Sequence, residues 1–176
     1  GLIVRPVIPR STAVFVATAI QAALKDNAKQ LSIWNGSPTK LLEIVKAYVT
    51  RSASTTPTGE AREFYLYRFT TSPSTGGTAD TQPLDSGMGT LASVTSSSVT
   101  VYGADNDATD LETSPLGVAT LYDSATAGGS NGQAVLFDEA DIRQPIILYE
   151  NEGITIQQDG TTGSEYMSAV IVFRVR

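Results

Sequence analysis

The sequence contains no cysteine and no histidine among its 176 residues. Their absence excludes disulfides, thiolate nucleophiles, zinc sites built from Cys and His, and catalytic triads that depend on histidine. Charged residues are also scarce, at 17% of the chain. Most enzyme mechanisms are therefore hard to build from this composition, and we expect a binding or structural protein without a cofactor.

The charge that is present does not favour nucleic acid as a partner. The formal net charge is −6 and the sequence pI is about 4.6, whereas phosphate binding needs clustered Lys and Arg. The distribution is uneven, with +5 on residues 1–51 and −11 on residues 52–176. This asymmetry is either a chance partition of the surface or a sign that the N-terminal third contacts an acidic partner.

Long apolar runs are absent too. No stretch approaches the roughly 18–20 apolar residues of a membrane span, because the segment Thr12–Leu24 is short and Gln21 interrupts it. The first six residues, GLIVRP, lack the basic region of a signal peptide. We therefore expect no membrane partner.

Hydroxyl side chains and turn residues dominate instead, with 22 Thr, 17 Ser, 15 Gly and 8 Pro. This composition is typical of strands and turns. Strands are predicted at 12–20, 31–34, 40–50, 63–71, 91–95, 98–102, 118–122, 133–137, 145–150, 153–158 and 166–175. The fold class is therefore predicted to be all-β, as a single antiparallel β-sandwich over residues 12–176.

Three segments of this prediction carry further expectations. Residues 21–30 are interpreted as a short helical turn, and a helix over 15–30 is the competing interpretation. Residues 72–90 are predicted to form a long loop. Strand 40–50 is apolar on both faces and is expected in the interior of a sheet, with Leu41, Glu43, Val45, Ala47 and Val49 on one face.

Residues 1–11 are predicted to form an extended N-terminal arm, because Pro6 and Pro9 disfavour a helix. Disordered tails are usually poor in apolar residues, but this arm is rich in them. The candidate contacts with another subunit or a capsid are Leu2, Ile3, Val4, Arg5, Val7, Ile8 and Arg10. The alternative is that the arm forms an edge strand of its own sandwich.

Few motifs suggest chemistry. The acidic segment containing Asp105, Asp107 and Asp110 is the best candidate for calcium, but it lacks the spacing of an EF-hand loop. Residues 138–141 spell DEAD without any phosphate-binding glycine loop, and are interpreted as an acidic loop. The tyrosines and Trp34 could stack on sugars, although core packing is the more frequent use.

Two regions carry a resemblance to a known class of proteins. The first is Leu31–Ser37, LSIWNGS, followed by the strand from Lys40; the second is Pro145–Leu148 followed by Glu152–Gln157, EGITIQ. Together they resemble the capsid decoration, or cement, proteins of tailed bacteriophages. The resemblance implies a jelly-roll β-sandwich on the outer surface of the virion, bound to the major capsid protein as a homotrimer, without catalysis. The alternative is a jelly-roll module of a phage fibre tip that recognises carbohydrate.

Overall fold

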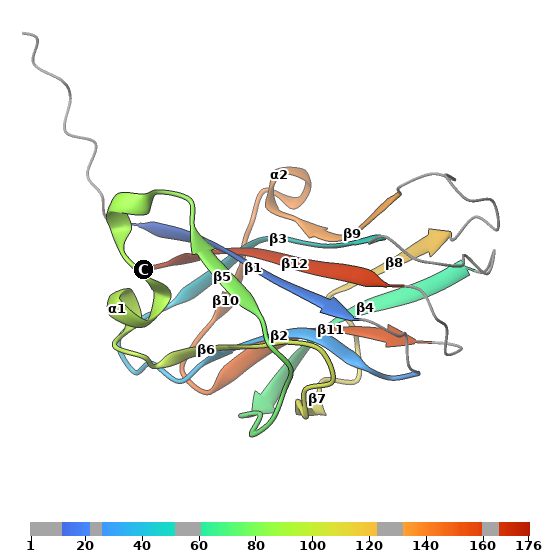
Figure 1. Ribbon diagram of the computed structural model, residues 1–176, viewed down its shortest axis with the longest axis horizontal. Helices are drawn as coiled ribbons and strands as arrows, with labels where there is room; N and C mark the ends of the chain where they lie inside the picture. Colours follow the sequence, from blue (N-terminus) through green and yellow to red (C-terminus); the bar gives the residue numbers. More distant parts are fainter. Residues whose placement is uncertain (1–11, 22–25, 52–60, 123–131, 160–165) are drawn as a thin grey trace, which may run out of the picture.

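Two antiparallel sheets of six strands each pack face to face in the computed structural model (Figure 1). The model describes residues 12–21, 26–51, 61–122, 132–159 and 166–176. The first sheet contains β1 (Ala13–Gln21), β3 (Leu42–Arg51), β5 (Asp80–Pro83), β9 (Gln133–Asp138), β10 (Ile146–Leu148) and β12 (Met167–Val175). The second contains β2 (Lys29–Asn35), β4 (Ala61–Thr71), β6 (Val99–Tyr102), β7 (Thr109–Leu111), β8 (Gly117–Tyr122) and β11 (Glu152–Asp159).

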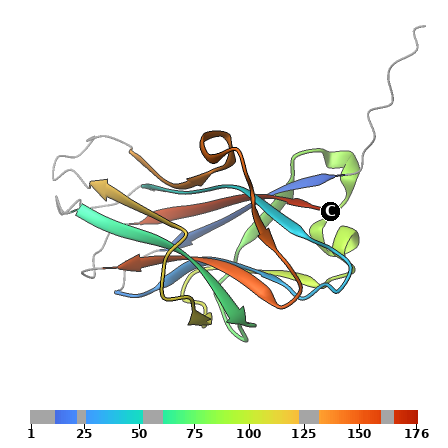
Figure 2. The ribbon, with the colours of Figure 1, turned by 180° about the vertical axis from the view of Figure 1, so that it is seen from behind.

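The order of the strands confirms the predicted all-β jelly-roll sandwich. Across the first sheet, β1 pairs with β12, β12 with β3, and β3 with β9. Across the second, β2 pairs with β11, β11 with β4, and β4 with β8. The chain crosses between the layers after nearly every long strand (Figure 2), as a jelly roll requires.

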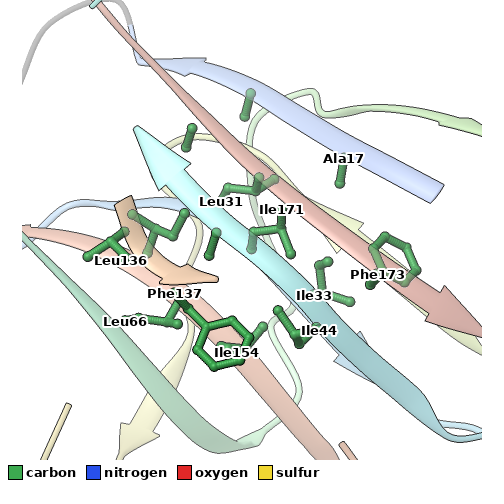
Figure 3. Close-up of a cluster of buried hydrophobic side chains, with 14 of the residues drawn as sticks. Ala17, Leu31, Ile33, Ile44, Leu66, Leu136, Phe137, Ile154, Ile171 and Phe173 are labelled. Atoms are coloured by element: carbon green, nitrogen blue, oxygen red, sulfur yellow. The ribbon is translucent and has the colours of Figure 1, made fainter. Parts of the chain in front are cut away.

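The core lies between the sheets and is built by alternation along each strand. Figure 3 shows side chains from both layers meeting there, among them Ile33, Ile154, Ile171 and Phe173. The Phe15 and Phe173 rings stack with centroids 5.8 Å apart. The inward face of β12 consists of Met167, Ala169, Ile171, Phe173 and Val175, which are all buried. These residues alternate along the strand with Ser168, Val170, Val172 and Arg174, which point to the other side of the sheet.

Strand β3 lies inside its sheet as expected, but the predicted division of its faces is wrong. The pairing with β12 passes from Lys46 opposite Val172 to Ile44 opposite Phe173, which leaves Val45 without a partner. This β-bulge inserts one extra residue and changes which side chains share a face. The core therefore receives Leu42, Ile44, Ala47 and Val49, whereas Glu43 is on the outer side of the sheet.

Several short elements also differ from expectation. Residues 91–95 form helix α1 (Leu91–Thr95), not a strand, because the Thr90 side chain accepts a hydrogen bond from the Ser93 amide and so caps its first turn. The predicted loop 72–90 contains β5 and the 3₁₀ helix η1 (Ser86–Met88). The interpretation of residues 138–141 as a loop is wrong, because Asp138 caps α2 (Glu139–Ile142) and the next three residues form its first turn.

The helix considered for 15–30 is wrong over the described part of that range. Residues 13–21 are a strand fully paired to β12, and residues 29–30 already belong to β2. Part of the shorter helical turn, residues 22–25, lies outside the described residues. The β-branched and aromatic residues of 12–20 therefore outweigh the helix formers that follow them.

Both long sides of the sandwich are closed by backbone contacts. On one side, a Cβ added at Gly117 in β8 would lie 1.9 Å from the Leu136 carbonyl oxygen in β9, so only glycine permits this approach. On the other side, Gly77 donates to the Ala104 carbonyl at 2.8 Å, and Gly103 donates to the Gly77 carbonyl at 2.9 Å. These contacts leave the two outer sheet faces as the broad surfaces of the molecule.

Candidate functional site

Part of the outer face of the second sheet is covered by a loop of the chain itself. Trp34 on β2 stacks on Phe69 of β4, with ring centroids 5.6 Å apart. Ala108, from the loop between β6 and β7, is buried with this pair, and Tyr102 and Leu111 pack around it. This small second core makes the region around Trp34 and Phe69 part of the folded interior.

Buried polar contacts hold that loop in place. The Ser32 hydroxyl lies 2.7 Å from both the Asn106 side-chain oxygen and the Thr155 hydroxyl. The Asn106 amide nitrogen donates to the Gly103 carbonyl at 2.8 Å. All three side chains are at most 5% exposed, and a satisfied buried network of this kind rigidifies the structure around it.

The acidic segment considered for calcium also holds in place the loop that covers Trp34 and Phe69. The Asp107 carboxylate accepts hydrogen bonds from the amides of Ser74 and Thr75, at 2.8 and 2.9 Å, and from the Ser74 hydroxyl at 2.6 Å. These bonds, with the Ser74 hydroxyl contributing most, lower the pKa of Asp107 to about 2. Asp110 accepts a hydrogen bond from the Thr71 hydroxyl instead.

The three candidate carboxylates are therefore not brought together. Asp105 and Asp110 occupy left-handed backbone conformations, with φ of 56° and 55°, which Asp tolerates better than most residues. Among the residues described, no three acidic side chains are grouped closely enough to hold a metal ion. The segment acts in the structure as a set of turn-forming side chains.

The outer face of the first sheet is different, because it is apolar and no described loop crosses it. Pairing register places Val16 beside Val172, and Thr18 beside Val170, Tyr48 and Val135 in one row across four strands. Ile20 is 59% exposed and Val135 is 39% exposed. We call this surface the apolar face. Its exposed residues are Ile20, Leu84 and Val135, its half-buried residues are Val14, Val16, Tyr48 and Val172, and Val170, at 7% exposure, is buried among them.

The contacts of β1, β3, β9 and β12 explain why no described element covers the apolar face. Within the described parts of the chain, β1, β3, β9 and β12 make their extensive contacts with sheet neighbours, with the opposite sheet and with α2. Figure 1 shows α2 at the margin beside β3 and β9. Three apolar side chains of the face, Ile20, Leu84 and Val135, are exposed, so the face offers apolar area that a partner would remove from water.

One end of the apolar face is bordered by a charged network. Arg174 on β12 donates to Glu139 of α2 at 2.5 Å and to Glu43 of β3 at 3.1 Å, and Arg176 reaches Glu43 at 3.0 Å. Glu139, followed by Glu43, raises the pKa of Arg174. Lys46 pairs with Asp138 at 3.2 Å, and its ammonium lies 5.6 Å from the Tyr48 ring centroid.

Asp138 joins α2 to the same border. Its carboxylate accepts the Ala140 amide at 2.9 Å, and this bond, together with Lys46, lowers the pKa of Asp138. The residues of the DEAD segment therefore serve as a helix cap and as ion-pair partners.

A smaller aromatic surface on the second sheet is half-buried. Tyr65 and Tyr67, two residues apart on β4, stack with ring centroids 5.8 Å apart. The Tyr65 hydroxyl donates to Glu63 at 2.8 Å, which raises the pKa of Tyr65 to about 12. Val118 of β8, which lies beside Tyr65 in the ladder, is 54% exposed.

The sequence-based site residues on the arm, Leu2, Ile3, Val4, Arg5, Val7, Ile8 and Arg10, lie outside the described residues. The apolar face was missed at the sequence level. Its signal was nevertheless present, because Val170 and Val172 alternate with the inward residues of β12, and Val14 and Val16 do the same in β1. A strand whose inward and outward positions are both apolar has a second apolar face to cover.

None of the described helices is both long and apolar enough to cross a membrane. In comparisons with known proteins, no protein-family model matches the chain, and no curated protein matches it in sequence.

Proposed function

We propose that this protein is a non-catalytic structural subunit that attaches to the outer surface of a bacteriophage capsid and reinforces it. The observation that carries the proposal is the apolar face, which this sandwich leaves without a described cover and which suits the contacts between subunits of a homotrimer. The resemblance of the LSIWNGS and EGITIQ regions to decoration proteins supplies the identity of the partner, the major capsid protein.

Such a subunit stabilises the capsid because its binding is thermodynamically linked to capsid assembly. A ligand that binds the assembled shell but not the dissociated subunits stabilises the shell. Assembly of the ligand as a homotrimer multiplies weak contacts into avidity. The proposal therefore needs a rigid scaffold and interaction surfaces, and requires no catalytic group, cofactor or nucleic-acid contact.

The test is co-sedimentation of the purified chain with empty capsids assembled from the major capsid protein of the same genome. We expect saturable binding to assembled capsids, no binding to free capsid subunits, and a higher capsid melting temperature. A bovine serum albumin sample of equal concentration controls for trapping. Failure to co-sediment with capsids at micromolar concentration would contradict the proposal.

A second function, carbohydrate recognition by a fibre-tip module, is favoured by the stacked Tyr65 and Tyr67 rings beside Glu63. Aromatic faces with an adjacent carboxylate suit the apolar and hydroxyl surfaces of a sugar. A glycan array tests it: binding that is lost in Tyr67→Ala but kept in Tyr149→Ala, an exposed tyrosine outside this pair, would favour recognition over cementing.

A further inference from the structure

The apolar face and the sequence of the arm are complementary. The face offers Val and Ile side chains on β1 and β12, with Leu84 beside its start. The arm contains five apolar residues among its first eight, namely Leu2, Ile3, Val4, Val7 and Ile8. We propose that the apolar face is the docking site for the N-terminal arm, residues 1–11, of a second copy of the chain.

The length of the arm matches the surface. Eleven extended residues span up to about 36 Å, and the nine residues of β1 span about 30 Å. One arm can therefore run along the face from end to end, with its apolar side chains meeting the row of Val16 and Val172 and the row of Tyr48 and Val135.

Charge agrees with this pairing. Asp80 of β5 lies opposite Thr18 at the margin of the face and is exposed. Among the described residues, the hydrogen-bond partner of Asp80 is the neutral amide of Gln82, at 3.1 Å, so its charge is not neutralised there. Arg5 and Arg10 of the arm bring the opposite charge to this margin.

The direction of β1 favours a neighbouring copy over the chain's own arm. The arm enters β1 at its first residue, and β1 then runs along the face toward Gln21. An arm on its own face must reverse direction between Ile8 and Thr12. A reversal within these five residues needs a tight turn directly after Ile8, which Pro9 restricts to extended conformations, whereas the arm of a second copy needs no reversal.

This inference rests on the self-association included in the proposed function, and it is tested without capsids. A photo-reactive p-benzoylphenylalanine replaces Val7 in the full chain, and equal amounts of ¹⁴N and ¹⁵N protein are mixed, irradiated and digested. We expect cross-links between the arm peptide and peptides of β1 or β12 that combine both isotopes. Cross-links confined to one isotope would assign the face to the chain's own arm and overturn the proposal, as would cross-links to other surfaces.

Light scattering of variants gives a second, independent measurement. Deletion of residues 1–10 and Val172→Lys should each weaken self-association at least tenfold. Val118→Lys, at an exposed valine of a strand in the other sheet, is the matched control and should leave it unchanged. Unchanged circular dichroism and melting of the monomer show that each variant folds. A wild-type chain that stays monomeric at micromolar concentration overturns the inference, whereas intact association without capsid binding contradicts only the proposed function.

Discussion

Asp107 joins two loops of the cover over Trp34 through a single carboxylate. Its carboxylate accepts hydrogen bonds from Ser74 and Thr75, which belong to the first loop. Asp107 itself belongs to the second loop, which also contains Asn106 and Ala108. Because Trp34 is the only tryptophan in the chain and is 7% exposed, its fluorescence reports whether the cover is closed.

We therefore predict that Asp107→Ala shifts the Trp34 emission to longer wavelength at neutral pH while the far-ultraviolet circular dichroism stays unchanged. The pKa of Asp107 is lower in the folded chain than its ordinary 3.8, so its contribution to stability is present above about pH 4 and is lost as the pH falls toward 2. The wild-type emission should shift over the same range. Asp141→Asn, an exposed residue of α2, is the control; an emission unaffected by Asp107→Ala would refute the prediction.

Gly153 shows how closely β11 approaches the aromatic pair. A Cβ at this position would lie 2.2 Å from the Phe69 ring, which is itself held by Trp34. We predict that Gly153→Ala destabilises the protein by about 1–3 kcal/mol, as overpacking of a filled core does. Urea denaturation measures the change.

The double variant Gly153→Ala with Phe69→Leu tests that cause. A smaller side chain at Phe69 removes the clash, so the cost of Gly153→Ala should fall when measured in the Phe69→Leu background. Additive costs in the two variants would show that the ring contact is not the reason.

At the scale of elements, α2 is held to the first sheet by charge. Arg174 connects it to β3, and Lys46 with Asp138 connects its first turn to the same strand. Neither contact is fully exposed, since the Arg174 and Glu139 side chains are 26% and 21% accessible.

We predict that Arg174→Met lowers the free energy of unfolding by about 1.5–3 kcal/mol, the range for hydrogen bonds to charged groups. The Met side chain keeps the packing of the aliphatic stem, so the loss reports the guanidinium. Arg143→Met, at an exposed position next to α2, is the matched control and should change stability by less than about 0.5 kcal/mol. Equal losses in the two variants would contradict the assignment.

Long strands with strict alternation were predictable from the sequence, and β12 is the clearest example. Short elements were not, because their formation depends on partners distant in the chain. β5 exists because residues 80–83 pair with β1, and β7 because residues 109–111 pair with β4. α1 was mistaken for a strand because its β-branched residues outweigh a cap formed by one Thr hydroxyl.

At the scale of the whole molecule, the two outer faces are unequal. One is closed by Trp34, Phe69 and their loop, and the other carries the apolar face. The sequence shows apolar residues at both alternations of a strand, but it does not show which face a loop will cover. That choice depends on contacts such as Ser32 with Asn106, which are 74 residues apart.

We predict that the melting temperature is insensitive to chelator and to calcium. Asp107 is occupied by hydrogen bonds, and Asp105 and Asp110 are not gathered with it in the described structure. Differential scanning fluorimetry with EDTA and with millimolar CaCl₂ should give one melting temperature within error. A calcium-dependent rise that Asp110→Asn abolishes would instead identify an ion site in this loop.

The unpaired Val45 of β3 has a consequence for how related sequences should be aligned. Without it, Leu42, Glu43, Ile44, Lys46, Ala47 and Tyr48 would alternate inward and outward without interruption. Deletion of Val45 would restore a regular ladder between β3 and β12. Deletion of another residue of β3 would move every side chain that follows it to the opposite face of the sheet. When diverged homologues are compared, a one-residue gap at Val45 is therefore compatible with a conserved sandwich, and aligners that penalise gaps inside strands would misplace the remainder of β3.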